Sequence, residues 1–246
     1  MFSPALVPAI MLLLWGCTGL KHISTDDPLF VDHEITYVEK ISIDKSSVPN
    51  IDNVLQPKPN EKFLWMRPAL SRNNILSDSA KTKKFWKNKV SEPVRLSQIN
   101  PDQVARALNN RLSHSGYFHN SVGFDTVRIG KKKAKYQYIT HLKEPYLLRE
   151  VSFPEPVSPL TEALSQSQPQ SMLVPGSIYS LAIIKEERIR INRYLADKGF
   201  IYFNPEHILI IADTTIGNKQ MDVRVTVKPE TPAEFRKPYE IGYLYL

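Results

Sequence analysis

The sequence predicts an α+β fold made of small repeated modules, and three observations lead to this prediction. Prolines outnumber glycines by 19 to 9, which favours many short elements over long uninterrupted helices. A helical stretch followed by two alternating runs occurs twice along the chain. Two segments that begin with Pro-Tyr, at residues 145–151 and 238–244, share the same apolar spacing, and each follows the last strand of a copy.

The composition is that of an ordinary globular protein. Of the 246 residues, 42% are hydrophobic and 23% are charged, which excludes a disordered, collagen-like or coiled-coil chain. The net charge of +7 suits a protein that works near anionic membrane surfaces or nucleic acid, and it identifies neither partner.

The first copy begins with a helix that Asn100-Pro101-Asp102 opens and Gly116 ends. Apolar residues recur at i, i+4 and i+8 along this helix, namely Val104, Leu108 and Leu112. Two alternating runs follow, at 121–129 and 134–142, and a lysine-rich turn separates them. The pattern predicts a helix, a strand, a hairpin turn and a second strand.

The second copy repeats this order, with a helix from near Tyr179 to Gly199. Apolar residues mark one side of this helix, namely Ile184, Ile191 and Leu195. An apolar run at 208–212 and an alternating strand at 221–227 complete the copy. Each Pro-Tyr segment is interpreted as the first strand of a new unit, so that a unit consists of a strand, one or two helices and two strands.

The only cysteine, Cys17, ends an apolar run that starts near the N-terminus. The run is shorter than the roughly 20 residues that span a bilayer, and it has the position of a signal-peptide core. Leu14-Trp15-Gly16-Cys17 resembles a bacterial lipobox, which implies that Cys17 is lipidated and becomes the first residue of the mature chain. A buried inert thiol and an uncleaved anchor are the alternatives.

The helix end Leu112-Ser113-His114-Ser115-Gly116-Tyr117-Phe118 is matched by Leu195-Ala196-Asp197-Lys198-Gly199-Phe200. Together with the Pro-Tyr strands, these residues resemble the POTRA domain, the periplasmic β-α-α-β-β module of outer-membrane assembly proteins of the BamA/TamA type. Residues 56–60, 91–94 and 187–190 are most similar to the lipoprotein branch of the TamL type found in Bacteroidota. The resemblance covers most of the chain after Cys17.

The resemblance and the repeat together predict how the chain is divided. Within the first module we expect a strand at 33–43, a helix at 49–57 and a buried strand at 63–66. The expected segments are a signal peptide (1–16), a lipidated linker (17–28), a divergent POTRA-like module (29–90), two further POTRA-like modules (91–143 and 144–229) and the first strand of a truncated module (238–246).

In a POTRA-like sheet the first strand pairs with the third, so the resemblance implies that the second strand is an edge. The free N–H and C=O groups of such an edge can pair with an incoming extended chain. The residues expected to form these strand-addition edges are Val122, Phe124, Thr126 and Arg128 in the first copy, and Ile208, Leu209, Ile210 and Ile211 in the second.

Proteins of this family end in a membrane barrel, for which the sequence has too few residues. We therefore expect no membrane barrel in this chain, and interpret it as a fragment or a truncated gene product. A natural short lipoprotein that supplies only the periplasmic modules is the alternative.

Signatures of catalysis are missing from the sequence, which contains no G-x-S-x-G elbow, P-loop or glycine-rich fingerprint. The S-x-x-K string at 42–45 falls in a predicted strand and lacks its companion motifs. The six histidines are scattered and interpreted as solvated or capping, and Glu186 and Glu187 as a solvated helix face. We expect no catalytic residue, metal site or cofactor; a hydrolase with an unrecognised site is the remaining enzymatic alternative.

A basic segment with two aromatic residues is a candidate contact to an anionic surface. Its residues are Lys83, Lys84, Phe85, Trp86 and Lys87. Nucleic acid would use the same residue types, but an exported protein rarely meets it, so no nucleic-acid partner is expected.

The sequence thus predicts a non-enzymatic periplasmic POTRA array, held at the periplasmic face of the outer membrane. Its expected partners are unfolded outer-membrane proteins or other components of the assembly machinery, bound by β-strand addition. The lipid anchor, together with a C-terminal barrel missing from this chain, would attach it to the membrane. The alternative is a structural envelope lipoprotein that bridges the outer membrane to another periplasmic component.

Overall fold

The structure, a computed structural model, describes residues 20, 22–39, 51–62, 67, 69–70, 91–240 and 242. Its contacts divide the chain into two compact units. Unit 1 comprises the described residues of 1–38, 50–109 and 121–141, and unit 2 those of 39–49, 110–120 and 142–246.

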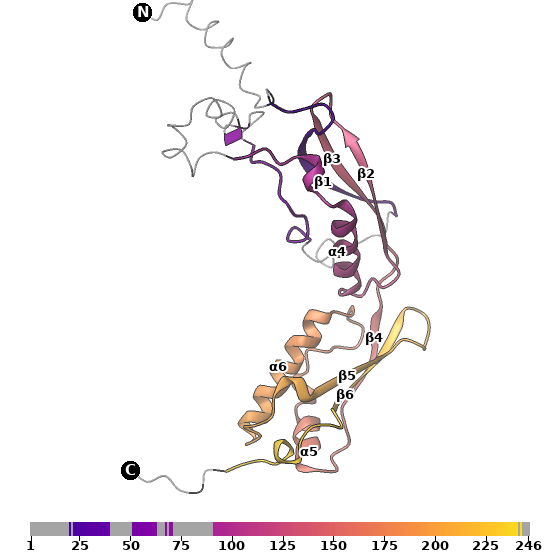
Figure 1. Cartoon of the computed structure of the whole chain (residues 1–246). Coiled ribbons are helices and arrows are strands. Elements are labelled where there is room, and N and C mark those ends of the chain that lie inside the picture. Colours follow the sequence, from indigo (N-terminus) through magenta and orange to yellow (C-terminus); the bar gives the residue numbers. More distant parts are fainter. Residues whose placement is uncertain are drawn as a thin grey trace, which may run out of the picture. The chain divides into compact units, whose positions relative to one another are not determined.

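Unit 1 contains a three-stranded sheet with the order β1-β3-β2 (Figure 1). β1 (Leu29–Tyr37) runs parallel to β3 (Lys133–His141), and β2 (Ser121–Arg128) runs antiparallel to β3. The predicted helix is α4 (Pro101–Ser113), and its first turn is capped by Asn100, whose Oδ1 accepts from the Gln103 N–H at 3.0 Å. The helix and both strands predicted for this copy are confirmed.

The core of unit 1 forms where α4 packs on one face of this sheet. Side chains of β3 alternate between partly and fully buried, as expected for a central strand with one face on a helix. The buried residues of this cluster are Phe30, Ile99, Val104, Ala105, Leu108, Tyr136 and Tyr138. The i, i+4 spacing of apolar residues in the sequence therefore marks the helix face that contacts the sheet.

The expected division of the N-terminal half is wrong, because β1 and β3 belong to one sheet. The sequence pattern predicts that residues 29–37 belong to a separate module ending at residue 90, whereas they pair with residues 133–141. A parallel pair needs a long crossover, so its two strands lie far apart in sequence and no local pattern identifies the partner. Ile23, in the expected linker, is also buried, in a cluster with Leu29 and Val31.

Other expectations for this region differ in detail. The strand expected at 33–43 is observed at 29–37, and the described residues of 49–57 form a turn rather than a helix. The strand expected at 63–66 and the S-x-x-K string at 42–45 lie outside the described residues.

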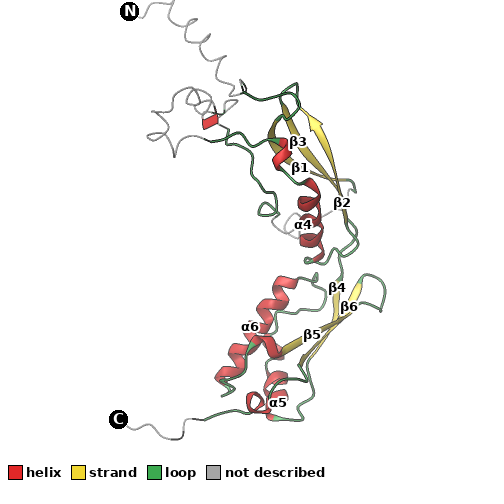
Figure 2. Ribbon diagram, in the orientation of Figure 1, coloured by secondary structure: helices red, strands yellow, loops and turns green. Residues whose placement is uncertain are grey.

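Unit 2 repeats this architecture with the sheet order β4-β6-β5 (Figure 2). β4 (Leu147–Ser152) is parallel to β6 (Gln220–Val227), which is antiparallel to β5 (Ile208–Asp213). The predicted strands and the helix α6 (Leu181–Asp197) are confirmed. The packed residues form one cluster, whose fully enclosed members include Leu164, Ile191, Leu195, Ile208, Met221 and Val225.

Unit 2 has a second helix, α5 (Pro159–Gln166), whose position the sequence pattern does not predict. Ser158 caps it by accepting from the Thr161 N–H, and Pro159 occupies its first turn. A serine followed by proline before Leu160, Ala163 and Leu164 is the local signal that would have found it.

The described part of the last expected strand, 238–240 and 242, is not a strand. Tyr239 instead donates its N–H to the Gly199 carbonyl at 2.8 Å.

The full order β-α-α-β-β is present in unit 2, and the described residues of unit 1 show β-α-β-β, so the α+β fold class with POTRA-like modules is confirmed. Among the described residues, no helix has both the length and the apolar character that crossing a membrane requires.

Candidate strand-addition edges

The sheet order of each unit leaves its second strand, β2 or β5, at one edge. The opposite edges, formed by β1 and β4, are partly covered by the segment that precedes the long helix. In unit 1 the Phe30 N–H donates to the Val94 carbonyl at 2.9 Å. In unit 2 the Leu148 N–H donates to the Ser177 carbonyl at 2.9 Å, and the Leu148 carbonyl accepts from the Gly176 N–H. The more accessible edges are therefore β2 and β5.

The direction of each backbone group in β2 follows from one hydrogen bond. Ile129 donates its N–H to the Lys133 carbonyl at 2.8 Å, and this pair continues the register in which Arg128 faces Ala134. In an antiparallel pair, hydrogen-bonded and non-bonded positions alternate. The non-bonded positions, whose N–H and C=O groups point away from β3, are thus Val122, Phe124, Thr126 and Arg128, the four residues expected from the sequence.

The same reasoning gives a different result for β5. The Lys228 N–H donates to the His207 carbonyl at 2.8 Å, so Leu209 and Ile211 occupy hydrogen-bonded positions that point toward β6. The outward positions are Ile208, Ile210 and Ala212, although the Ile208 N–H already donates to the Pro205 carbonyl. Four consecutive residues cannot all present backbone groups to one edge, so the expectation for Leu209 and Ile211 is wrong on this point.

Two of the outward positions, Val122 and Phe124, place their side chains on the core side of the sheet, whereas Thr126 and Arg128 are exposed. Val122 and Phe124 pack against the core of unit 1, and the Phe124 ring meets the Tyr136 ring edge-on, with centroids 6.0 Å apart. Gly123 and Asp125 are on the exposed face. A strand added at this edge would extend the core with alternate side chains and leave the others in solvent, a pattern that favours alternating apolar and polar sequences.

One end of the β2 edge is not open. The Arg128 guanidinium donates to the Thr25 carbonyl at 3.0 Å, and Lys132 donates to the Leu20 carbonyl at 3.0 Å. The N-terminal segment of the described chain therefore lies beside the β2–β3 turn. Among the described residues, the outward backbone groups from Val122 to Thr126 have no backbone hydrogen-bond partner beyond the sheet.

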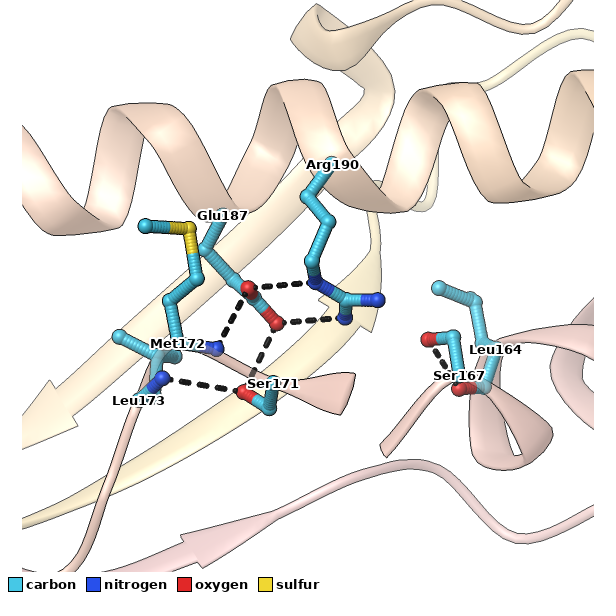
Figure 3. A network of polar contacts seen from close by, with 7 residues as sticks. All are labelled: Leu164, Ser167, Ser171, Met172, Leu173, Glu187 and Arg190. Atoms are coloured by element: carbon cyan, nitrogen blue, oxygen red, sulfur yellow. Dashed lines mark hydrogen bonds and ion pairs between the residues drawn. The ribbon is translucent and has the colours of Figure 1, made fainter. Parts of the chain in front are cut away.

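A buried ion pair in unit 2 fixes the segment that leads to the covered edge of β4 (Figure 3). The Glu187 carboxylate, completely buried, accepts from Arg190 Nε at 2.8 Å and Nη2 at 2.7 Å. It also accepts from the Ser171 hydroxyl at 2.8 Å and the Met172 N–H at 3.0 Å (Figure 3). Through these bonds α6 holds the chain a few residues before Gly176 and Ser177, which bond to β4.

The interpretation of Glu187 as part of a solvated helix face is therefore wrong. Burial alone would raise the pKa of its carboxyl, but the hydrogen bonds from Arg190, Met172 and Ser171 outweigh burial, and the pKa lies below its ordinary value. Glu187 is thus a structural anion that joins α6 to the 171–172 segment.

His33 is likewise buried rather than solvated. Its Nε2 donates to the Pro57 carbonyl at 3.0 Å, and its Nδ1 lies 3.3 Å from the Tyr138 hydroxyl. Burial lowers the pKa of the His33 imidazole, which favours the neutral ring. Among the described residues, no three His, Cys, Asp or Glu side chains gather as metal ligands.

The remaining candidates, Cys17 and the basic segment at 83–87, lie outside the described residues. Lipidation at Cys17 and surface contact through Lys83, Lys84, Phe85, Trp86 and Lys87 stay predictions.

Comparison with known proteins gives likenesses to solved structures only, since no family model and no curated protein matches. BamA from Haemophilus ducreyi lacking POTRA domains 1–3 has a TM-score of 0.36 and 16% identity, over 61% of this chain and 27% of that one. POTRA1–3 of the periplasmic domain of Omp85 from Anabaena has a TM-score of 0.36 and 10% identity, over 81% and 61%. Haemophilus influenzae BamA POTRA3–5 has a TM-score of 0.31 and 12% identity, over 84% and 99%. The chain thus spans 27% and 61% of the first two structures.

Proposed function

We propose that this chain is a non-enzymatic binding module of an outer-membrane protein assembly or translocation system, and that it binds extended polypeptide at the β2 edge by strand addition. One observation carries the proposal: Val122, Phe124 and Thr126 direct their backbone groups away from β3 while Val122 and Phe124 pack on the core. The POTRA-like motifs in the sequence support it. The β5 edge, with Ile210 and Ala212, is a shorter second site.

The proposed clients are unfolded outer-membrane proteins. Their membrane strands alternate apolar and polar side chains, which is the pattern that an extension of this sheet would accommodate on its two faces. Backbone pairing tolerates many sequences, so a single edge suits many clients. Other components of the assembly machinery could use the same edge.

The proposed location is the periplasmic face of the outer membrane, with attachment through a lipid on Cys17, as in the TamL-type branch that the sequence resembles. Cells that express the full chain and are fed radiolabelled palmitate test this. Labelled protein in the membrane fraction, and loss of the label in Cys17→Ser, is the expected result. Equal labelling of both chains, or none in either, would contradict lipidation at Cys17.

The binding proposal is tested with the purified full chain and a fluorescent peptide of about ten residues that alternates aromatic or aliphatic with polar residues, as a membrane β-strand does. Thr126→Pro removes an outward N–H, and Thr126→Val keeps it. Loss of one or two hydrogen bonds should weaken binding about tenfold in the proline variant only.

Ile210→Pro provides the same test for β5, and the double proline variant shows whether the two edges share the peptide. Leu209→Pro is unsuitable, because it removes a bond to β6 and so disturbs the sheet itself. Circular dichroism establishes that each variant is folded. Unchanged affinity in a folded double variant would exclude strand addition at both edges.

A further inference from the structure

The turn after α6 repeats the turn after α4, and both belong to unit 2. Gly116 and Gly199 each have φ +91°, and each accepts a backbone hydrogen bond from a tyrosine. The Gly116 carbonyl accepts from Tyr146 at 2.9 Å, and the Gly199 carbonyl accepts from Tyr239 at 2.8 Å. An aromatic ring packs edge-on against the tyrosine in both places, Phe118 in the first turn and Tyr202 in the second.

The first turn has a further occupant, the segment that leads into α6. Tyr179 donates its N–H to the Tyr146 carbonyl at 2.9 Å, and Leu181 donates to the His114 carbonyl at 2.8 Å. The Tyr179 ring lies 5.1 Å from the Phe118 ring. A side chain at Gly116 would place its Cβ 2.9 Å from the Tyr179 carbonyl oxygen, so the fit is close.

The second turn has no such occupant among the described residues. By sequence position Asp197 corresponds to His114, and neither its carbonyl nor that of Tyr239 accepts a backbone hydrogen bond from a described residue. The side chains around them are exposed: Ile201 to 59%, Tyr202 to 55% and Tyr239 to 41%. The aromatic pair and the two acceptors that the first turn uses are thus present in the second turn, and no described residue occupies them.

Charge complementarity indicates what could cover this surface. In the first turn, Leu181, the first residue of α6, donates its N–H to the carbonyl of His114, which directly follows α4, so the positive end of one helix dipole lies at the negative end of another. In the second turn, the negative end of α6 carries Asp197, a carboxylate in the position of His114. The positive N-terminal end of a helix should therefore bind at this site more strongly than an extended strand without basic residues.

We propose that Asp197, Gly199, Ile201, Tyr202 and Tyr239 form a docking surface for an extended aromatic segment that leads directly into a helix N-terminus, supplied by a further module of this kind. The aromatic residue of that segment would pack on Tyr202 as Tyr179 packs on Phe118, and its N–H would bond to the Tyr239 carbonyl. The first N–H of its helix would bond to the Asp197 carbonyl. This surface is separate from the β2 and β5 edges, so the proposal stands independently of strand addition.

The test uses the ¹⁵N-labelled full chain and a peptide with the sequence of residues 175–185, which is the segment that occupies the first turn. The peptide is added in trans and, in a second form, joined to the C-terminus through about twelve Gly and Ser residues. The linker raises the effective concentration to the millimolar range, so that a weak complex is also populated.

The expected result is a saturable shift of the Ile201, Tyr202 and Tyr239 amide signals. Tyr202→Ala should weaken binding about two- to tenfold, the range of an aromatic contact, and so should alanine at the peptide position of Tyr179. Ile189→Ala, which changes an exposed residue of α6 outside the turn, is the matched control and should bind normally.

Two outcomes would overturn the proposal. One is the absence of shifts in both forms of the experiment. The other is a set of shifts at Ile210 and Ala212 instead of the turn, which would support strand addition at β5 and exclude docking at Tyr202.

Discussion

The buried carboxylate of Glu187 is bound by both Nε and Nη2 of Arg190, one helical turn away on α6. The same carboxylate holds Ser171 and Met172, so this pair connects α6 to the segment that covers part of the β4 edge. The ion pair therefore stabilises the segment that covers part of the β4 edge, and β5 remains the more accessible edge of this sheet.

Removal of Glu187 should destabilise unit 2 strongly. Glu187→Ala leaves the Arg190 guanidinium without its carboxylate and frees two donors of the 171–173 segment, a loss of about 3–5 kcal/mol in unfolding free energy. Urea unfolding of the full chain measures this. Glu186→Ala, at the exposed neighbouring position, should change stability by less than about 0.5 kcal/mol. Equal effects of the two substitutions would show that the ion pair contributes nothing specific.

The stability of unit 1 should fall as the pH drops below neutrality, because of His33. Its pKa is lowered in the folded state from the ordinary 6.5, so the unfolded chain binds the proton more readily. The His33 contribution is complete above about pH 6.5 and is lost as the pH falls toward the folded pKa. Urea unfolding between pH 7.5 and 5 should show this slope. His33→Gln should flatten it and the exposed-site control His22→Gln should not; a slope that survives in His33→Gln would assign it to another group.

Gly116 should tolerate alanine less well than Gly130. Both have positive φ, which costs an L-residue about 1–2 kcal/mol. At Gly116 the new Cβ would also lie 2.9 Å from a backbone oxygen, whereas at Gly130 nothing lies within 4 Å. We expect Gly116→Ala to cost about 1–3 kcal/mol more than Gly130→Ala, measured by thermal unfolding. Similar melting temperatures would contradict the close approach of Tyr179 to this turn.

Proline at two adjacent positions of β2 should destabilise the fold to very different degrees. Thr126 directs its N–H away from β3, so Thr126→Pro removes no sheet hydrogen bond and should cost little. Asp125 directs its N–H toward Gln137, so Asp125→Pro should cost about 1–3 kcal/mol. Chemical unfolding of the two variants measures the difference. If Thr126→Pro were the more damaging, the backbone directions assigned here would be reversed.

Local features of the fold could be predicted from the sequence, and long-range pairing could not. The apolar spacing of Val104, Leu108 and Leu112 and the stop at Gly116 identified α4 and its buried face. No local pattern could show that Leu29–Tyr37 pairs with β3, because the partner lies about a hundred residues further along the chain. The module boundary at residue 90 failed for this reason.

The outward residues of a candidate edge could be predicted where the strand alternates visibly in sequence, as in β2, but not in β5. The resemblance to POTRA domains gave the strand order, and the residues expected in β2 occupy alternate positions of that strand, whose backbone groups point away from β3. In β5 the apolar run Ile208–Ile211 hides the alternation, since side chains on both faces are aliphatic and the backbone direction depends on the register with β6. The burial of Glu187 was missed because its partners, Ser171 and Met172, come from a loop with no periodic signal.

The measurement that tests strand addition most directly is amide hydrogen exchange of the full chain, with and without the alternating peptide. If the peptide pairs with the β2 edge, exchange should slow at Val122, Phe124 and Thr126 and stay unchanged at Gly123 and Asp125, whose N–H groups already bond to β3. Protection of consecutive residues, or protection confined to other parts of the chain, would contradict pairing at this edge.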